Sequence, residues 1–150
     1  MKKKVLLLIG IFVTITAIII GCLMVANDEG SEYIGEESSF NVIDVNNVSM
    51  EISEVTSTDI TLIITDTNKE HYMYGEWFVI EKEIKGKWYK VDTLRDDIAF
   101  NAIGYSPNKN NQLNLEYNWE NIYGKLPDGS YRIVLMVGNY YSAAEFEIKG

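Results

Sequence analysis

Few side chains in this sequence could carry out nucleophilic or acid–base catalysis. His71 is the only histidine and Cys22 the only cysteine among the 150 residues. A hydrolytic triad needs a nucleophile, a histidine and an acid brought together, and the sequence has no Gly-x-Ser-x-Gly motif. Because His71 follows Lys69-Glu70, we interpret it as an exposed loop residue. The sequence therefore predicts no catalytic residues and a protein that is not an enzyme.

Only oxygen ligands are grouped in a way that could hold a metal ion. A zinc site needs several His or Cys ligands, which the sequence lacks. Residues 66–70 (Asp-Thr-Asn-Lys-Glu) offer three oxygen ligands at alternate positions, and Asp96-Asp97 offer two more. Neither group is a complete calcium loop, and Lys69 and Arg95 would repel the ion. We expect no metal and no cofactor, and the sequence leaves calcium binding open.

Acidic residues outnumber basic ones, 22 against 13, and the formal net charge is -9. This balance disfavours nucleic acid as a partner, because phosphate backbones require clusters of Lys and Arg. Carboxylates could serve a glycan hydrolase, but that chemistry needs two acids about 5 to 9.5 Å apart in a cleft. We interpret the acidity as surface charge that keeps the protein soluble.

The N-terminal residues predict export from the cytoplasm. Lys2-Lys3-Lys4 precede an almost purely apolar run at 5–20, and Gly21-Cys22 follow. A charged start, an apolar stretch and a small residue at the end are typical of a secretory signal peptide. Residues 19–22 (Ile-Ile-Gly-Cys) resemble the bacterial lipobox. This resemblance implies cleavage after residue 21 and lipidation of the Cys22 thiol, with acyl chains such as palmitate anchoring the protein.

An uncut membrane anchor is the alternative for the same segment. The apolar run continues to Ala26, and residues 5–26 are about long enough to span a bilayer as a helix. Ile20 also stands where Ala or Ser is commoner in the lipobox. Both alternatives place the rest of the chain outside the cell. Residues 22–39 are then expected to be the lipidated cysteine and a flexible tether, since 27–39 are acidic, rich in Gly and Ser, and without a basic residue.

From residue 40 onward the pattern is that of short β-strands. Apolar and β-branched residues alternate with polar ones, and turn residues separate the runs. Seven to eight strands are expected, near 48–52, 60–65, 77–84, 88–91, 113–119, 131–137 and 141–148. With no convincing helix, this spacing predicts an all-β antiparallel sandwich over residues 40–150. Phe100 and Ile103, in a loop-like region, are expected to plug the open end of its core.

Two local signals add detail to the sandwich. Lys85-Gly86-Lys87 predict a hairpin turn between neighbouring strands. Pro127 and Gly129 mark a turn before the run at 131–137, which is mostly apolar on both faces and therefore central in its sheet. Tyr131 resembles the tyrosine corner of immunoglobulin-type sandwiches, so its hydroxyl is expected to bond a backbone group just upstream.

Short motifs follow one another along the domain: YMYGEW at 72–77, IEK at 80–82, GKWY at 86–89, IAF at 98–100, IGY at 103–105, Trp119 and YGKLPDGSYRIV at 123–134. In this order they resemble a family of bacterial Ig-like domains that occur in small lipoproteins of Gram-positive bacteria and at the outer ends of some membrane-bound sensor-type metallopeptidases. Asp59, Asp66 and Leu135 depart from the family pattern. The resemblance implies an Ig-like sandwich and no established enzymatic role.

Tyrosines offer the one candidate binding surface. Tyr72, Tyr74, Tyr105 and Tyr123 fall at strand ends or in loops, where flat rings are favoured as contacts for a partner. The alternative is that these rings cap the ends of the sandwich and lie buried beside loops.

The sequence thus predicts a monomeric Ig-like binding module, tethered to the cell membrane by lipid and facing the extracytoplasmic side. Its partner would be an unidentified protein or cell-wall ligand. An inhibitor or sensory ectodomain acting on a membrane or cell-wall enzyme is the first alternative, and a small glycan hydrolase is the less favoured one.

Overall fold

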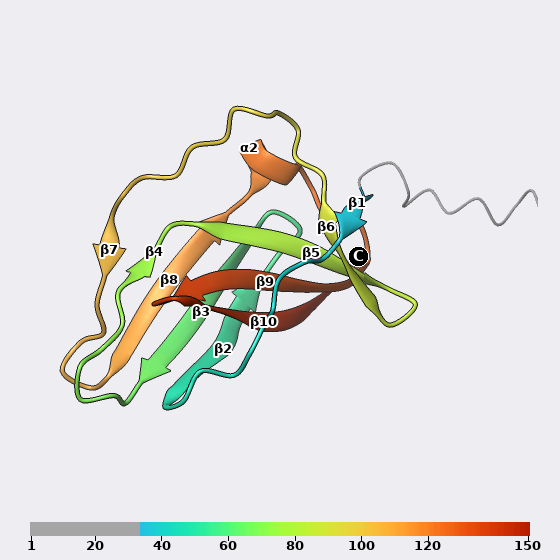
Figure 1. The fold of residues 1–150 in the computed structure, drawn as a ribbon. Helices are drawn as coiled ribbons and strands as arrows, with labels where there is room; N and C mark the ends of the chain where they lie inside the picture. Colours follow the sequence, from blue (N-terminus) through green and yellow to red (C-terminus); the bar gives the residue numbers. More distant parts are fainter. Residues whose placement is uncertain (1–33) are drawn as a thin grey trace, which may run out of the picture. The chain divides into compact units, whose positions relative to one another are not determined.

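A computed structural model describes residues 34–150 as two packed antiparallel sheets (Figure 1). The larger sheet has the order β1 (Ile34–Glu37), β6 (Lys87–Val91), β5 (Phe78–Ile84), β9 (Gly129–Val137), β10 (Tyr140–Ile148). The smaller sheet has the order β2 (Val48–Val55), β3 (Asp59–Asp66), β8 (Gln112–Asn118). A short ribbon pairs β4 (Tyr74–Gly75) with β7 (Gly104–Tyr105), and α2 (Glu120–Tyr123) follows β8. The predicted all-β antiparallel sandwich is confirmed.

The expected signal peptide, Cys22 and the first part of the expected tether lie outside the described residues. Among the described residues, no helix is long and apolar enough to cross a membrane. Seven of the strands there have five residues or more, in agreement with the seven to eight expected. The shorter β1, β4 and β7 were not predicted.

Alternation along the strands builds the core between the two sheets. Ile60, Leu62 and Ile64 of β3 are buried, whereas the residues between them are partly exposed. From the larger sheet, Ile133 and Leu135 of β9 enter the same cluster. Side chains at every second position point to one face of a strand, so each sheet directs one set of apolar residues inward.

Two local predictions are confirmed by the backbone. The Tyr131 hydroxyl donates a hydrogen bond to the carbonyl oxygen of Pro127 at 2.8 Å, as expected for a tyrosine corner. Between β5 and β6, Lys85 and Gly86 have φ angles of 53° and 78°. A two-residue turn with positive φ at both central positions is the type I′ hairpin, whose twist matches that of the flanking strands.

The folded domain begins before residue 40, contrary to the expected boundary. Ile34 to Glu37, assigned to the tether from composition, form β1 and pair with β6. Acidic side chains here are not free: Glu36 pairs with Lys90 at 2.6 Å and Glu37 with Lys87 at 2.9 Å. Opposite charges on neighbouring strands thus stabilise a segment whose composition alone is typical of disorder.

Residues 38–43, here called the crossing segment, run over the outer face of the larger sheet. They connect β1 at one edge with β10 at the other, as the cyan chain of Figure 1 shows. Ile43 N–H donates to the carbonyl oxygen of Tyr141 at 2.9 Å. The ring of Phe40 packs on those of Tyr141 and Trp77, with centroid distances of 4.8 and 6.0 Å. This cover accounts for the burial of Arg132 on the outer face of β9, whereas Met136 on that face stays exposed.

A buried ion pair lies under the crossing segment. Glu81 and Arg132 are neighbours on β5 and β9, and Arg132 Nε lies 2.7 Å from Glu81 Oε2. The guanidinium also contacts Ser38 Oγ at 3.4 Å and lies 4.5 Å from the ring centroid of Trp88. A charge removed from water needs such partners, because an unpaired one costs several kcal/mol, on the order of 3 to 5.

Candidate functional site

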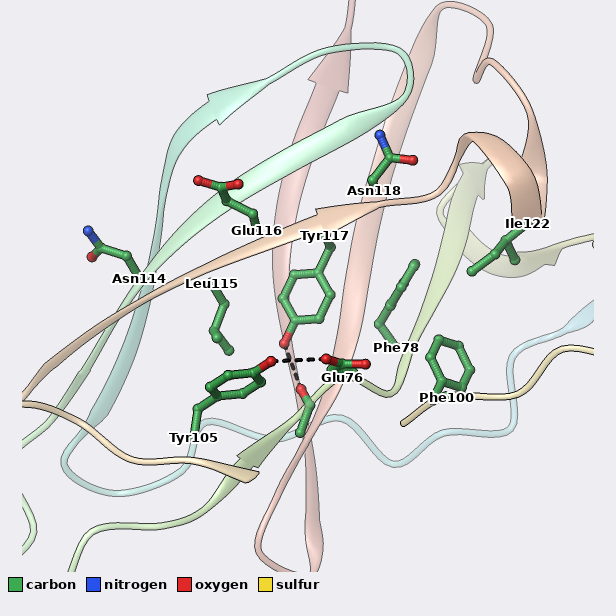
Figure 2. Close-up of a pocket in the computed structure, with 11 residues that line it drawn as sticks. Glu76, Phe78, Phe100, Tyr105, Asn114, Leu115, Glu116, Tyr117, Asn118 and Ile122 are labelled. Atoms are coloured by element: carbon green, nitrogen blue, oxygen red, sulfur yellow. Dashed lines mark hydrogen bonds between the residues drawn. The ribbon is translucent and has the colours of Figure 1, made fainter. Parts of the chain in front are cut away.

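The candidate site is a cleft of about 420 Å³ beside the free edge of β8. It lies between β8 and the long loop that connects β6 to β7 (Figures 1 and 2). Its wall is formed by apolar side chains from β5, β8, α2 and the loop, namely Phe78, Phe100, Leu115, Tyr117 and Ile122. Clefts with apolar walls and a few polar groups are the usual binding sites of proteins.

Aromatic packing holds this wall in place. Phe78 lies at the start of β5, and its ring centroid is 5.2 Å from that of Tyr117 and 5.5 Å from that of Phe100, both in edge-to-face orientation. Phe78 and Tyr117 are buried, and Phe100 is partly exposed to the cleft. Such ring pairs add stability beyond the burial of area, so the loop residue Phe100 is anchored on the core. The expected plugging role of Phe100 agrees with this contact, whereas Ile103 is 49% exposed and does not plug the core.

A carboxylate forms the polar rim of the cleft. Glu76 accepts a hydrogen bond from Asn101 Nδ2 at 2.8 Å and another from the Tyr105 hydroxyl at 2.9 Å. The hydrogen bond from Asn101, and to a smaller extent the one from Tyr105, lower the pKa of Glu76 below its usual value. The rim therefore carries a fixed negative charge at neutral pH. The hydroxyl of Tyr117 is occupied as well, since it donates to the Gly75 carbonyl at 3.1 Å (Figure 2).

The lining does not have the arrangement that glycoside hydrolysis requires. Glu116 is the second carboxylate of the lining, but Figure 2 shows it on the opposite side of the β8 ribbon from Glu76. Two acids must face a common bond for that reaction. The part of the chain that the structure describes also has no group of three or more His, Cys, Asp or Glu side chains able to hold a metal ion.

Of the four tyrosines proposed as a binding face, only Tyr105 lines the cleft. Tyr74 and Tyr123 are 1% and 6% exposed, so their assignment to a surface is wrong. The Tyr74 hydroxyl donates to Asp66 Oδ2 at 3.1 Å, and the Tyr123 oxygen accepts from Ile80 N–H at 3.4 Å. Burial raises the pKa of both tyrosines. For these two, the alternative reading as caps of the core is the correct one.

The remaining tyrosine and the lone histidine lie near one end of the smaller sheet. Tyr72 is partly buried, and its backbone N–H donates to Asp66 Oδ2 at 2.8 Å. His71 is partly buried as well, with Nε2 3.1 Å from Asn111 Oδ1. His71 is therefore in a loop, as expected, but contacts a neighbouring turn instead of standing fully exposed.

The carboxylate of Asp66, considered above as a calcium ligand, stabilises this loop. It is fully buried, and Asn68 donates to Oδ1 through its backbone and its side chain at 3.0 and 2.8 Å. Tyr72 and Tyr74 donate to Oδ2. Burial raises the pKa of Asp66, but the hydrogen bonds outweigh it and hold that pKa below its usual value. Four protein donors occupy the oxygens that a calcium ion would need.

Sequence reasoning missed most of the cleft. From the sequence, Glu76, Phe78 and Tyr117 are only parts of motifs or strands, and Ile122 belongs to neither. The alternation in β8 identifies the inward residues Leu115 and Tyr117. The alternation does not reveal that β8 is the edge strand of the smaller sheet, because the order of strands in a sheet depends on long-range pairing.

The sequence profile of a family described as "Bacterial Ig-like domain" matches residues 43–147. No curated protein matches the chain, and no solved structure matches it.

Proposed function

Because the chain belongs to the family of bacterial Ig-like domains, we propose that it is an interaction module that works outside the cytoplasm, tethered to the membrane. Ig-like domains of this family are typically non-catalytic, and membership suggests an extracellular interaction module. The partner is a protein or a cell-wall component. Function in such sandwiches resides in loops and edges that the rigid sheets position.

The observation that carries this proposal is the cleft beside β8. Its wall exposes part of Phe100 and Ile122, and its rim carries the Glu76 carboxylate. Aromatic and aliphatic surface next to a charged rim is the usual composition of a recognition site. Catalytic use would require a second converging acid or a nucleophile, and the lining supplies neither.

Cross-linking in cells tests the use of this cleft. A photo-reactive amino acid placed at Ile122, in the cleft, is expected to capture a partner. The same residue at Met136, which is 44% exposed on β9 and away from the cleft lining, is the matched control and is expected to capture none. Equal capture from both positions, or from neither, would contradict the proposal.

The tether proposed here is a lipid on Cys22. The support is the sequence at 19–22, where the thiol becomes the thioether of a diacylglycerol. Cys22→Ser is expected to abolish incorporation of labelled fatty acid and to leave an uncut precursor of higher mass. If the wild-type protein takes up no labelled lipid and keeps its N-terminus, the uncut single-pass anchor is correct instead.

A further inference from the structure

The smaller sheet ends in an open edge at β8. Among the residues that the structure describes, β8 pairs only with β3, in the order β2-β3-β8. The register runs without interruption from Asp59 opposite Asn118 to Thr65 opposite Gln112. An edge strand presents a row of backbone N–H and C=O groups that another strand can pair with.

Hydrogen bonds at the two ends of β8 show which residues face this edge. Asp66 N–H donates to the Asn111 carbonyl, and Trp119 N–H donates to the Thr58 carbonyl, each at 2.9 Å. Both pairs continue the β3–β8 register, and residues in an antiparallel pair alternate between bonding the neighbour and pointing away. Residues 111, 113, 115, 117 and 119 therefore bond the β3 side, and 112, 114, 116 and 118 point their backbone groups outward.

Only one of these four outward residues is satisfied within the domain. Asn108 N–H donates to the Gln112 carbonyl at 2.8 Å, and Asn108 Oδ1 accepts from Gln112 N–H at 3.3 Å. Within residues 34–150, the backbone N–H and C=O groups of Asn114, Glu116 and Asn118 have no such partner. These three residues also line the cleft, so the open edge forms one of its walls.

The other long edge strands are partly covered or irregular. The β10 edge is bridged at one position, where Val42 pairs with Tyr141, and it does not border the cleft. The pairing of β2 with β3 is irregular between Ile52 and Glu54, and β1 has only four residues and an irregular register. Natural proteins commonly block exposed edges with bulges, short strands, Pro or charged side chains, above all Lys. The seven residues of β8 (QLNLEYN) include no bulge, Lys or Pro, and one charged side chain, Glu116.

We propose that the cleft binds an extended, basic peptide segment of the partner, which adds to β8 as a fourth strand of the smaller sheet. This inference rests on the proposed function and names its partner class. Main-chain bonds to Asn114, Glu116 and Asn118 hold the peptide, as in other cases of strand addition. Alternate side chains point toward Phe78, Phe100 and Ile122 on one face and toward solvent on the other.

Charge selects a basic peptide over a second copy of this chain. Glu76 lies at the rim of the cleft and Glu116 lies on the other side of the same edge strand, so a carboxylate stands on each side of β8. The hydrogen bonds to Glu76 keep it ionised. The chain carries a formal net charge of -9, so pairing β8 with β8 of another copy would bring acidic surfaces together. Complementary charge steers a basic partner toward the edge and disfavours self-association.

The test uses the full chain in detergent micelles and a fluorescent peptide of the same length as β8, in which Lys alternates with Val and Phe. Binding is measured by fluorescence anisotropy.

The two variants at Glu116 separate the side chain from the backbone. Glu116→Ala removes the carboxylate and keeps the backbone N–H, whereas Glu116→Pro removes both the carboxylate and an N–H that does not bond to β3. The Pro variant is expected to bind about fivefold to tenfold more weakly than the Ala variant, the loss of roughly one strand hydrogen bond. Asn114→Pro is the second variant, and thermal melting checks that both variants fold.

Specificity controls complete the design. A peptide that is N-methylated at alternate positions cannot pair with β8 and is expected not to bind. A peptide in which Glu replaces each Lys is expected to bind at least about tenfold more weakly than the Lys peptide at low salt. Equal binding by the Ala and Pro variants would overturn strand addition. The protein could instead self-associate in a concentration-dependent way that Glu116→Pro abolishes. The strand paired with β8 would then come from a second copy of this chain, and the proposal of a basic peptide would be overturned.

The same variants separate this inference from the proposed function. If position 122 captures a partner in cells and Glu116→Pro leaves that capture unchanged, the interaction module stands and strand addition is wrong. If no partner is captured at all, the proposed function itself fails.

Discussion

Tyr131 connects the last turn of the domain to the core. Its ring is buried and stacks near Phe146, with centroids 5.7 Å apart. Its hydroxyl reaches back to the Pro127 carbonyl. Burial, with a smaller contribution from the charge of Asp128, raises the pKa of Tyr131 to about 12. The phenol is therefore held protonated well above the pH at which an unfolded tyrosine ionises.

Replacing this hydroxyl is expected to destabilise the domain in a pH-dependent way. Tyr131→Phe leaves the Pro127 carbonyl without its donor and should lower the free energy of unfolding by about 1 to 3 kcal/mol near neutral pH. As pH rises from 10.0 to about 12, the unfolded tyrosine loses its proton while the folded one keeps it, so the contribution of Tyr131 is lost in that window. Urea unfolding at about pH 8 and about pH 11 measures the difference.

Tyr140→Phe is the matched control, because Tyr140 is 49% exposed. It should leave the unfolding free energy within about 0.5 kcal/mol of the wild type at both pH values. A Tyr131→Phe variant as stable as this control would contradict the structural role of the corner.

At the scale of the element, the β5–β6 hairpin shows how a turn sets register. Type I′ geometry places both Lys85 and Gly86 at positive φ. Glycine adopts this conformation without cost, but a lysine there is strained by its Cβ. The turn then aligns Glu83 with Trp88 and Lys82 with Tyr89 on the paired strands.

Substitutions at the two turn positions are expected to have opposite effects. Gly86→Ala should lower the free energy of unfolding by about 1 kcal/mol, since Ala is strained at positive φ. A Cβ at Gly86 would meet no atom within 4 Å, so backbone strain alone is measured. Lys85→Asn should raise stability by a few tenths of a kcal/mol, about 0.3, because Asn tolerates this conformation. Chemical denaturation of both variants checks the signs, and a stabilising Gly86→Ala would contradict the turn type.

At the scale of the whole molecule, the crossing segment connects opposite edges of the larger sheet. It begins at β1, which the Glu36–Lys90 and Glu37–Lys87 pairs hold against β6. It then covers the buried pair of Glu81 and Arg132 and reaches β10. Residues before Phe40 therefore contribute to the same cooperative unit as the Ig-like core.

Truncation tests this boundary. A chain of residues 34–150 is expected to fold without added metal, because its apolar core supplies the stability and no ligand cluster is needed. A chain of residues 40–150 lacks β1 and Ser38, and should be less stable by at least about 1 kcal/mol, roughly 4 °C in Tm. Calorimetry of the two chains, with and without a chelator, measures both effects. Equal melting temperatures would restore the domain boundary expected from composition.

Several features of the fold could be predicted from the sequence because they depend on neighbours in the chain. The alternation at 60–65 and 113–119 follows from the two-residue period of a strand, and one buried face is enough to impose it. The turn at Lys85-Gly86 and the corner at Tyr131 need only a few adjacent residues. These local signals, with the family motifs, were sufficient for an antiparallel Ig-like sandwich.

Sheet order and long-range packing decided the rest. Tyr74 and Tyr123 stand beside turns in the sequence, yet hydrogen bonds to Asp66 and Ile80 place them inside. Ile34 to Glu37 lie in an acidic, glycine-containing stretch, and only their pairing with β6 makes them a strand. The cleft depends on which strand ends the smaller sheet and on where Phe100 packs. Those contacts join residues far apart in the chain, and their free energy comes from partners that no local pattern specifies.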